Sequence, residues 1–258
     1  MLYYLLYPLR DVFSFFNIFR YITFRAVMAA LFAFLISLLA GPSVIAAIKR
    51  LSIGQQVRKE DSKKLHELHG HKQGTPTMGG ILILIAVVLS TLLWSEFENR
   101  YIQLVLLCTL WLGVTGFADD YLKHIRKCSK GLTATAKFTS QITLGLVLGA
   151  VLFLDPQHQT TLDIPFLKDV SIELGIFYIV LVILVITGTS NAVNLTDGLD
   201  GLAIGSVVMA AVAFTILCYV SGNARLSDYL LIPFIKGSGE LTIFCASLVL
   251  FAMSLPPI

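Results

Sequence analysis

Long apolar runs alternate with short polar segments along most of the chain. A helix needs about 20 predominantly apolar residues to cross a bilayer, and seven uncharged runs are near or above that length. Each run is expected to be a helix, because a segment in lipid must satisfy its own backbone hydrogen bonds. We therefore predict an all-α, polytopic transmembrane bundle with about seven spans, forming one integral membrane domain over residues 1–258. The runs are Ala26–Ile48, Met78–Ser95, Tyr101–Ala118, Phe138–Leu154, Leu174–Leu195, Leu202–Val220 and Leu241–Pro256.

Composition supports a membrane protein. The 258 residues are 56% hydrophobic and 14% charged, whereas soluble domains have roughly 25% charged residues. A secretory signal peptide is not expected, because Arg20 and Arg25 interrupt the first apolar stretch and no A-x-A cleavage pattern follows a short hydrophobic region. The four cysteines have no CxxC spacing, so the sequence indicates neither a disulfide framework nor a zinc site.

Lys and Arg are distributed unequally between the two sides of the predicted bundle. If the N-terminus lies outside, the loops 49–77, 119–137 and 196–201 lie inside and carry twelve of the nineteen basic residues. The positive-inside rule therefore predicts an outer N-terminus and places these loops in the cytoplasm. Such basic loops can hold anionic lipid head groups or an anionic substrate. The outer loop 155–172 is expected to contain a short hairpin.

A polar segment, Thr189–Gly201, separates two of the apolar runs. Asn191, Asn194, Asp197 and Asp200 follow one another at three-residue intervals, and a helical segment would place these side chains along one face. Polar groups at the edge of a bilayer are costly and usually mark a pathway or a site. A polar turn with ordinary Asn and Asp turn residues is the simpler alternative. Four polar groups in register favour the site.

Two adjacent carboxylates end the third apolar run. Asp119 and Asp120 repel each other, which raises the pKa of one of them unless a cation lies between them. Mg²⁺ is a candidate for that cation, because it prefers oxygen ligands and usually keeps some waters and phosphate oxygens. Solvated charges at a helix end are the alternative. The predicted topology argues against this alternative, because that topology places the carboxylates of both polar segments on the same side of the membrane.

The stretch KQGTPTMGG (72–80) leads directly into the second apolar run. Thr75 or Thr77 can cap the helix that follows. Free backbone amides at a helix N-terminus beside Lys72 can bind an anion. Simple helix capping is the competing interpretation of this motif.

Carboxylates, a divalent metal ion, a lysine and a glycine-rich helix start together favour phosphoryl transfer, which depends mainly on positioning and charge neutralisation. The location predicts one soluble phosphorylated substrate and one lipid-borne partner. A membrane transporter is the alternative, because polar groups in broken helices are typical of transport sites, but these carboxylates lie at the ends of spans. A third alternative is a non-catalytic fragment that assembles with other membrane proteins.

Three motifs resemble those of phospho-N-acetylmuramoyl-pentapeptide transferases: KQGTPTMGG (72–80), GFADDYLK (116–123) and NAVNLTDGLDGLA (191–203). The resemblance runs to about residue 250, and the wider superfamily of polyprenyl-phosphate sugar-1-phosphate transferases shares part of it. It implies a Mg²⁺-dependent transferase in the bacterial cytoplasmic (inner) membrane, with its active face in the cytoplasm. Phospho-N-acetylmuramoyl-pentapeptide would pass from its UDP-activated form to undecaprenyl phosphate, giving lipid I and UMP for peptidoglycan synthesis. A related enzyme that uses UDP-N-acetylglucosamine is the alternative within this class.

The resemblance also implies roles for particular residues. The chain would act on UDP-N-acetylmuramoyl-pentapeptide and undecaprenyl phosphate at a lipid surface, would be able to form a homodimer and would bind no nucleic acid. No residue is assigned as a metal ligand. The implied catalytic residues are Asp119, Asp120 and Asp197, and the implied substrate-binding residues are Lys72, Thr75, Thr77, Asn191, Asn194 and Asp200.

One departure from the family pattern affects these expectations. Members of the family have about ten spans and continue to a third essential Asp in an F-M-G-D-type motif and to a histidine-rich loop. Neither motif is found in these 258 residues. We therefore expect a truncated member of the family, with little or no activity by itself.

Overall fold

The computed structural model contains two compact units. One comprises Met1–Gly131 together with Ile204–Ile258, and the other comprises Leu132–Ala203. The two units are described separately below. The residues described by the structure are 1–51, 79–124, 131–156, 158–164, 171–196 and 202–254.

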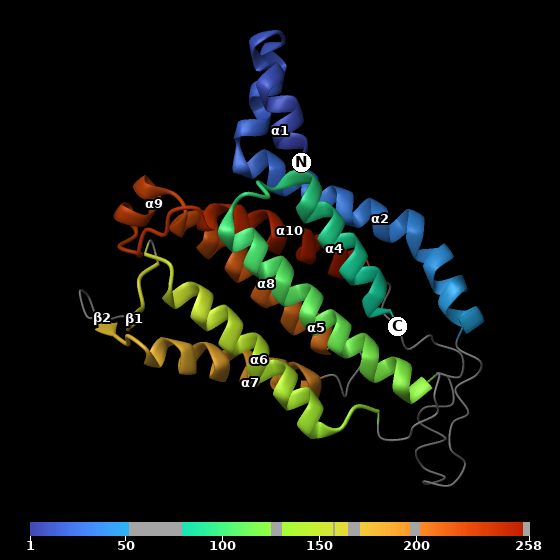
Figure 1. The fold of residues 1–258 in the computed structure, drawn as a ribbon. Helices are drawn as coiled ribbons and strands as arrows, with labels where there is room; N and C mark the ends of the chain where they lie inside the picture. The colour runs from blue at the N-terminus through green and yellow to red at the C-terminus, as the bar shows by residue number, and fades with distance from the viewer. Residues whose placement is uncertain (52–78, 125–130, 157, 165–170, 197–201, 255–258) are drawn as a thin grey trace, which may run out of the picture. The chain divides into compact units, whose positions relative to one another are not determined.

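Three apolar helices from distant parts of the chain form the core of the first unit (Figure 1). They are α2 (Ile22–Leu51), α4 (Gly80–Trp94) and α10 (Leu241–Ser254), and each packs against the other two. Small side chains such as Ala29 and Ala86 are completely buried in this core. Small residues let helix backbones approach closely, which is how helices in membranes gain packing energy.

A fourth helix, α5 (Arg100–His124), runs antiparallel to α4 after a short connection. The start of α4 and the end of α5 therefore lie together, and both line one pocket. Gly113 allows this close packing, because a β-carbon there would lie 2.6 Å from the Leu84 side chain. The remaining elements of this unit are α1 (Leu2–Leu6), η1 (Tyr7–Asp11), η2 (Ser14–Arg20), α9 (Ala224–Tyr229), η4 (Ser238–Glu240) and most of α8 (Leu202–Ser221).

The second unit is a pair of packed helices, α6 (Ala134–Phe153) and α7 (Phe177–Thr196). Gly145 and Gly149 lie one turn apart on α6 and pack directly against isoleucines of α7. The helices are joined through a short antiparallel hairpin, as predicted for the loop 155–172. Its strands are β1 (Thr161–Asp163) and β2 (Ser171–Glu173), with Thr161 paired to Glu173.

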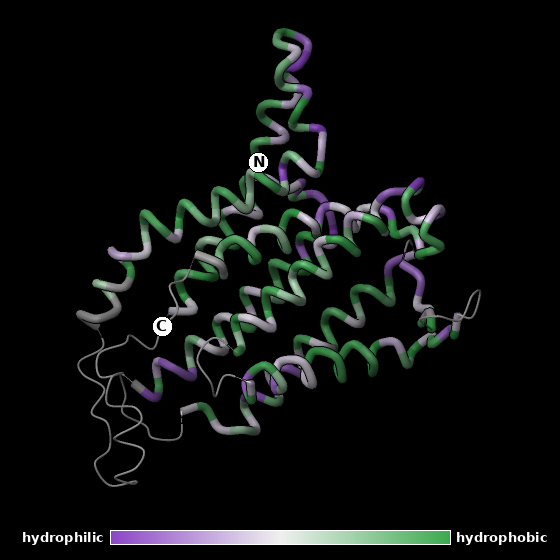
Figure 2. The backbone as a smooth tube through the Cα atoms, turned by 180° about the vertical axis from the view of Figure 1, so that it is seen from behind, coloured by the Kyte–Doolittle hydropathy of each residue, from purple (hydrophilic) through white to green (hydrophobic). Residues whose placement is uncertain are grey.

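The predicted all-α, polytopic membrane architecture is confirmed. Each of the seven apolar runs contains one helix, and five of these helices are long and apolar enough to cross a membrane. The exceptions are α4 and α10, with 15 and 14 residues, which are apolar but shorter than a typical span. Figure 2 shows hydrophobic residues along the bodies of the helices and hydrophilic residues at several of their ends. The prediction of a single membrane domain stays a prediction.

Candidate active site

Four of the nine predicted site residues lie in the described part of the chain, two in each unit. Asp119 and Asp120 are on α5, and Asn191 and Asn194 are on α7. The roles of all nine stay predictions. The five that lie outside the described residues are Lys72, Thr75, Thr77, Asp197 and Asp200.

Asp119 is held by a lysine one helical turn away. Its side chain is buried, and its Oδ2 atom lies 2.7 Å from Lys123 Nζ. The i,i+4 spacing puts the two side chains on the same face of α5. Lys123 also lies in the last turn, where a positive charge complements the negative end of the helix dipole. The Asp119 carboxylate is therefore fixed in one orientation by a charged hydrogen bond.

Gly131 packs against this ion pair. Its φ of +59° is in the left-handed region that favours glycine. A β-carbon at this position would lie 2.5 Å from Asp119 Oδ1 and 2.6 Å from Lys123 Cε. Any side chain at position 131 would therefore displace the carboxylate or the lysine. The sequence analysis assigned no site role to Lys123 or Gly131, although the Asp-x-x-x-Lys spacing was a usable signal for Lys123.

Asp120 faces a different environment from Asp119. Successive residues on a helix point about 100° apart, and Asp120 lines a pocket of about 270 Å³ between α4 and α5. It is half-buried and is the one charged residue among those that line this pocket. The adjacent carboxylates thus point in different directions, since Asp119 is paired with Lys123 and Asp120 borders a cavity.

Asn191 is anchored to α6 in the second unit. Its Nδ2 atom donates to Gln141 Oε1 at 2.9 Å and to the Thr187 carbonyl at 2.8 Å. Gln141 is buried, and its own Nε2 atom donates to Ser190 Oγ at 2.9 Å. The α7 helix continues through Asn194, which is exposed, so the helical three-residue step predicted for the polar segment holds for its two amides. Sequence analysis missed Gln141, whose signal was one amide within an apolar run.

Comparisons with known proteins identify the family of the chain. A sequence profile described as glycosyl transferase family 4 matches residues 102–254, and a signature of phospho-N-acetylmuramoyl-pentapeptide transferases matches residues 72–84. The chain is 50% identical over 248 residues to such a transferase from Desulfotalea psychrophila. The match covers 96% of this chain and 68% of the relative. The chain belongs to the phospho-N-acetylmuramoyl-pentapeptide transferase family.

Further members of this family show the same extent of similarity. The transferase from Desulforapulum autotrophicum is 50% identical over 248 residues, and that from Citrifermentans bemidjiense is 48% identical over 249 residues. In both cases the match again covers 96% of this chain and 68% of the relative. The family assignment therefore rests on nearly the whole chain as well as on its short motifs.

A metal ion in a transferase of this family requires oxygen donors at the site. Among the residues that the structure describes, no group of three or more His, Cys, Asp or Glu side chains could hold a metal ion. Asp119 and Asp120 do supply adjacent carboxylates at the end of α5. Carboxylate oxygens suit Mg²⁺, which commonly binds through one or two carboxylates and completes its coordination with water and substrate phosphate. The donor chemistry of this pair therefore fits such an ion.

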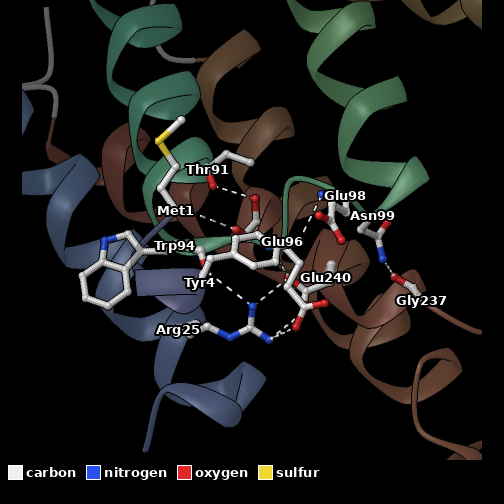
Figure 3. Close-up of polar contacts among 11 residues, drawn as sticks. Met1, Tyr4, Arg25, Thr91, Trp94, Glu96, Glu98, Asn99, Gly237 and Glu240 are labelled. Atoms are coloured by element: carbon white, nitrogen blue, oxygen red, sulfur yellow. Dashed lines mark hydrogen bonds and ion pairs between the residues drawn. The ribbon is translucent and has the colours of Figure 1, made fainter. Parts of the chain in front are cut away.

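A second carboxylate cluster lies at the opposite end of the α4–α5 pair (Figure 3). Arg25 is 1% exposed and binds Glu240 through two hydrogen bonds of 2.6 and 2.9 Å. Glu96 adds a contact of 3.4 Å to the same guanidinium, and its backbone amide donates to Glu240 at 2.9 Å. We call Arg25, Glu96 and Glu240 the Arg25 cluster. Sequence analysis missed its role and treated Arg25 only as an interruption of an apolar stretch.

The Arg25 cluster is enclosed by surrounding elements. The Met1 ammonium group donates to the carbonyls of Leu92 and Leu93 at 2.8 and 3.0 Å, and the Arg25 guanidinium lies 4.8 Å from the centre of the Tyr3 ring. Burial, and secondarily the nearby Glu240 carboxylate, raise the pKa of Glu96 above its ordinary value of 4.5. This cluster connects α2, η4 and the α4–α5 connection, so it stabilises the fold.

Proposed function

We propose that the chain transfers phospho-N-acetylmuramoyl-pentapeptide from its UDP-activated form to undecaprenyl phosphate, giving lipid I and UMP for peptidoglycan synthesis. The observation that carries this proposal is the match of nearly the whole chain to relatives named for this transfer. The transferase signature at residues 72–84 supports it. These similarities favour the muramoyl substrate over UDP-N-acetylglucosamine. The membrane helices support a lipid-borne acceptor.

We propose different roles for the two adjacent carboxylates of α5. Asp120 borders the pocket between α4 and α5, so we assign proton removal to it. Asp120 would take the proton from the lipid phosphate, and a phosphate oxygen would then attack the β-phosphorus of the nucleotide sugar. The bond from that phosphorus to the bridging oxygen would break, and UMP would leave. A two-step route through an aspartyl phosphate uses the same residues.

Polar residues of the motifs at 72–80 and 191–203 would bind the nucleotide sugar. Lys72 would neutralise charge on the diphosphate, and Asp197 with Asn194 would organise the catalytic centre. The anchoring of Asn191 to Gln141 supports a fixed position for that amide. The proposed substrate-binding residues are Lys72, Thr75, Thr77, Asn191, Asn194 and Asp200.

Mg²⁺ is the proposed cofactor, and no particular residue is assigned as its ligand. When bound, this ion would neutralise negative charge that develops on the transferred phosphoryl group. The proposed location is the bacterial cytoplasmic membrane, with the active face in the cytoplasm and the N-terminus outside. A homodimer is the proposed assembly, and no nucleic acid is involved.

Transfer of labelled UDP-N-acetylmuramoyl-pentapeptide to undecaprenyl phosphate, with Mg²⁺, tests the proposal. The 258-residue chain would be assayed beside a version extended with the C-terminal third of a relative. We expect lipid I and UMP from the extended version. Asp120→Asn should lower the rate at least 100-fold, whereas Glu98→Gln, which changes an exposed carboxylate far from this site, should leave the rate unchanged.

The alternatives predict different results. Absence of lipid I with both versions would contradict the transferase proposal, and uptake of solute into vesicles would then favour a transporter. Faster transfer from UDP-N-acetylglucosamine than from the muramoyl substrate would reassign the donor. Full activity of the 258 residues would support the transferase and contradict only the expectation of low activity.

A further inference from the structure

A chain of amide hydrogen bonds joins α6 to α7 in the second unit. Asn191 Nδ2 on α7 lies 2.9 Å from Gln141 Oε1 on α6 and 2.8 Å from the carbonyl oxygen of Thr187. Gln141 Nε2 in turn lies 2.9 Å from Ser190 Oγ. Gln141 is 7% exposed, whereas Asn191 is an exposed residue. A buried amide on one helix therefore holds an exposed amide on the other.

Close packing of the two helices makes this contact possible. Gly145 follows Gln141 by four residues, which places both on one face of α6. A β-carbon at Gly145 would lie 2.8 Å from Ile183 Cα. The α7 backbone therefore lies directly against this face of α6, and the Gln141 side chain reaches Asn191 two turns of α7 further on.

The Thr187 carbonyl decides which way the Asn191 amide is turned. A carbonyl oxygen only accepts hydrogen bonds, so the atom that faces it at 2.8 Å must be the Asn191 nitrogen. The second hydrogen of that nitrogen is directed at Gln141, which must therefore present its oxygen. The Gln141 nitrogen then donates to Ser190 Oγ, because a hydroxyl group can accept. The orientation of both amides follows from one backbone carbonyl.

This arrangement uses both hydrogens of the Asn191 amide inside the protein. An asparagine side chain has two donor hydrogens and one acceptor oxygen. Because its hydrogens are bonded to Gln141 and Thr187, Asn191 offers a ligand its Oδ1 atom and acts as an acceptor. The diphosphate of a nucleotide sugar has only acceptor oxygens and is a poor partner for this atom. Hydroxyl and N–H groups are good partners.

We propose that Gln141 is a positioning residue of the transferase, which turns Asn191 so that its Oδ1 atom accepts a hydrogen bond from a hydroxyl or N–H group of the nucleotide sugar. This inference rests on the proposed function and specifies the chemistry of one of its substrate contacts. Gln141 acts through Asn191, because its own side chain is buried and both of its amide heteroatoms are bonded to α7.

Replacing the buried amide tests the inference through kinetics. In the extended transferase, Gln141→Leu should raise the KM for the nucleotide sugar about 10-fold, roughly the effect of one neutral hydrogen bond. It should leave kcat and the KM for undecaprenyl phosphate within about twofold, which is typical of lost binding. Gln141→Glu should keep the KM within about threefold of the unaltered value, because a carboxyl oxygen accepts from Asn191 in the same place. An unchanged KM in Gln141→Leu would overturn the inference.

Gln103→Leu is the matched control. Gln103 is exposed on α5, and its Nε2 atom donates to the Phe97 carbonyl at 3.0 Å. The same substitution therefore removes an amide and a hydrogen bond outside the second unit, and it should change neither KM nor kcat. An equal rise of KM in both variants would show a general effect of losing an amide and would overturn the inference.

The Mg²⁺ dependence of the rate separates a substrate hydroxyl or N–H group from a metal ion, because an amide oxygen can also bind a cation. With a substrate donor, Gln141→Leu should raise the KM for the nucleotide sugar at every Mg²⁺ concentration. The Mg²⁺ concentration for half-maximal rate should stay the same. A rise of that Mg²⁺ concentration, with an unchanged KM at saturating Mg²⁺, would assign the Asn191 oxygen to the metal and overturn the inference.

Nuclear magnetic resonance tests the orientation of the amide without requiring turnover. In the 258-residue chain in lipid nanodiscs, labelled with isotopic asparagine, the side-chain N–H protons of Asn191 should exchange with water about 10-fold more slowly than those of the exposed Asn194. Gln141→Leu should remove this protection, and Gln103→Leu should retain it. Equal exchange of the two asparagines in the unaltered chain would overturn the inference.

Binding of the nucleotide sugar, measured without the lipid acceptor, separates the inference from the reaction. Binding that is about 10-fold weaker in Gln141→Leu, together with absence of lipid I from the unaltered extended chain, would support the contact and contradict the proposed function. Lipid I synthesis with equal binding by both proteins would support the function and overturn the inference. Absence of binding by both proteins would also overturn the inference.

Discussion

The two ends of the α4–α5 pair each carry a carboxylate bound to a cation, and their surroundings differ. Arg25 and Glu240 are both almost completely buried and joined by two short hydrogen bonds. About 30 Å away along α5, Asp119 is paired with a partly exposed Lys123, and its neighbour Asp120 borders a pocket. An ion pair alone therefore does not identify a site. Enclosure on all sides indicates a stabilising role, whereas the position of Asp120 beside a cavity is the reason why we propose a catalytic role for it.

The largest expected effect is on the Arg25 cluster. Arg25→Ala should lower the free energy of unfolding by about 3–5 kcal/mol, because it leaves the Glu240 carboxylate buried and unpaired. Equilibrium unfolding in mixed micelles measures this change. The double variant Arg25→Met/Glu240→Leu should recover most of the loss, since it removes both buried charges. A change below 1 kcal/mol for Arg25→Ala would contradict the stabilising role.

A smaller effect is expected from Gly131→Ala, and it should appear in activity. The added β-carbon would displace Asp119 or Lys123, and misplacement of a catalytic group by about 1 Å can lower a rate on the order of 100-fold. We expect kcat of the extended transferase to fall about 10- to 100-fold.

A matched glycine controls for backbone strain. Gly175 also has a positive φ, +52°, but a β-carbon there would meet nothing within 4 Å. Gly175→Ala should therefore share the cost of a left-handed alanine, about 1–2 kcal/mol, while kcat stays unchanged. Equal kcat values for the two alanine variants would show that Gly131 does not position Asp119.

The smallest expected effect concerns Glu96 and pH. Because burial raises the pKa of Glu96 in the folded state above 4.5, the folded protein binds more protons than the unfolded chain in the range just above pH 4.5. Its stability contribution is complete below pH 4.5 and is lost as the pH rises through the raised pKa. Glu96→Gln should remove this part of the pH dependence. Identical pH profiles of unfolding for both proteins would contradict it.

The sequence was sufficient for most of the fold. The seven apolar runs became helices with ends close to those predicted, because the cost of burying unpaired backbone groups in lipid acts on each segment separately. The hairpin in the loop 155–172 also appeared where expected.

The site was only partly accessible to sequence reasoning. The adjacent aspartates and the regularly spaced amides could be identified from the sequence as candidate site residues, because charged and amide side chains are costly next to apolar spans. Not all of the residues that contact these side chains could be identified from the sequence. Gly131 contacts Asp119 through a turn conformation, and Gln141 reaches Asn191 across two helices. Neither contact follows from hydropathy or from spacing along one helix.

The sequence by itself determined that this protein is helical, that it belongs in a membrane, and which polar residues are unusual there. Tertiary structure decided that Arg25 and Glu240, 215 residues apart, form one buried pair, and that Asp119 and Asp120 face a lysine and a pocket respectively. The physical reason is the distance along the chain over which each effect acts. Transfer of a segment into lipid depends on its own composition, whereas the environment of a charge depends on which distant segments pack around it.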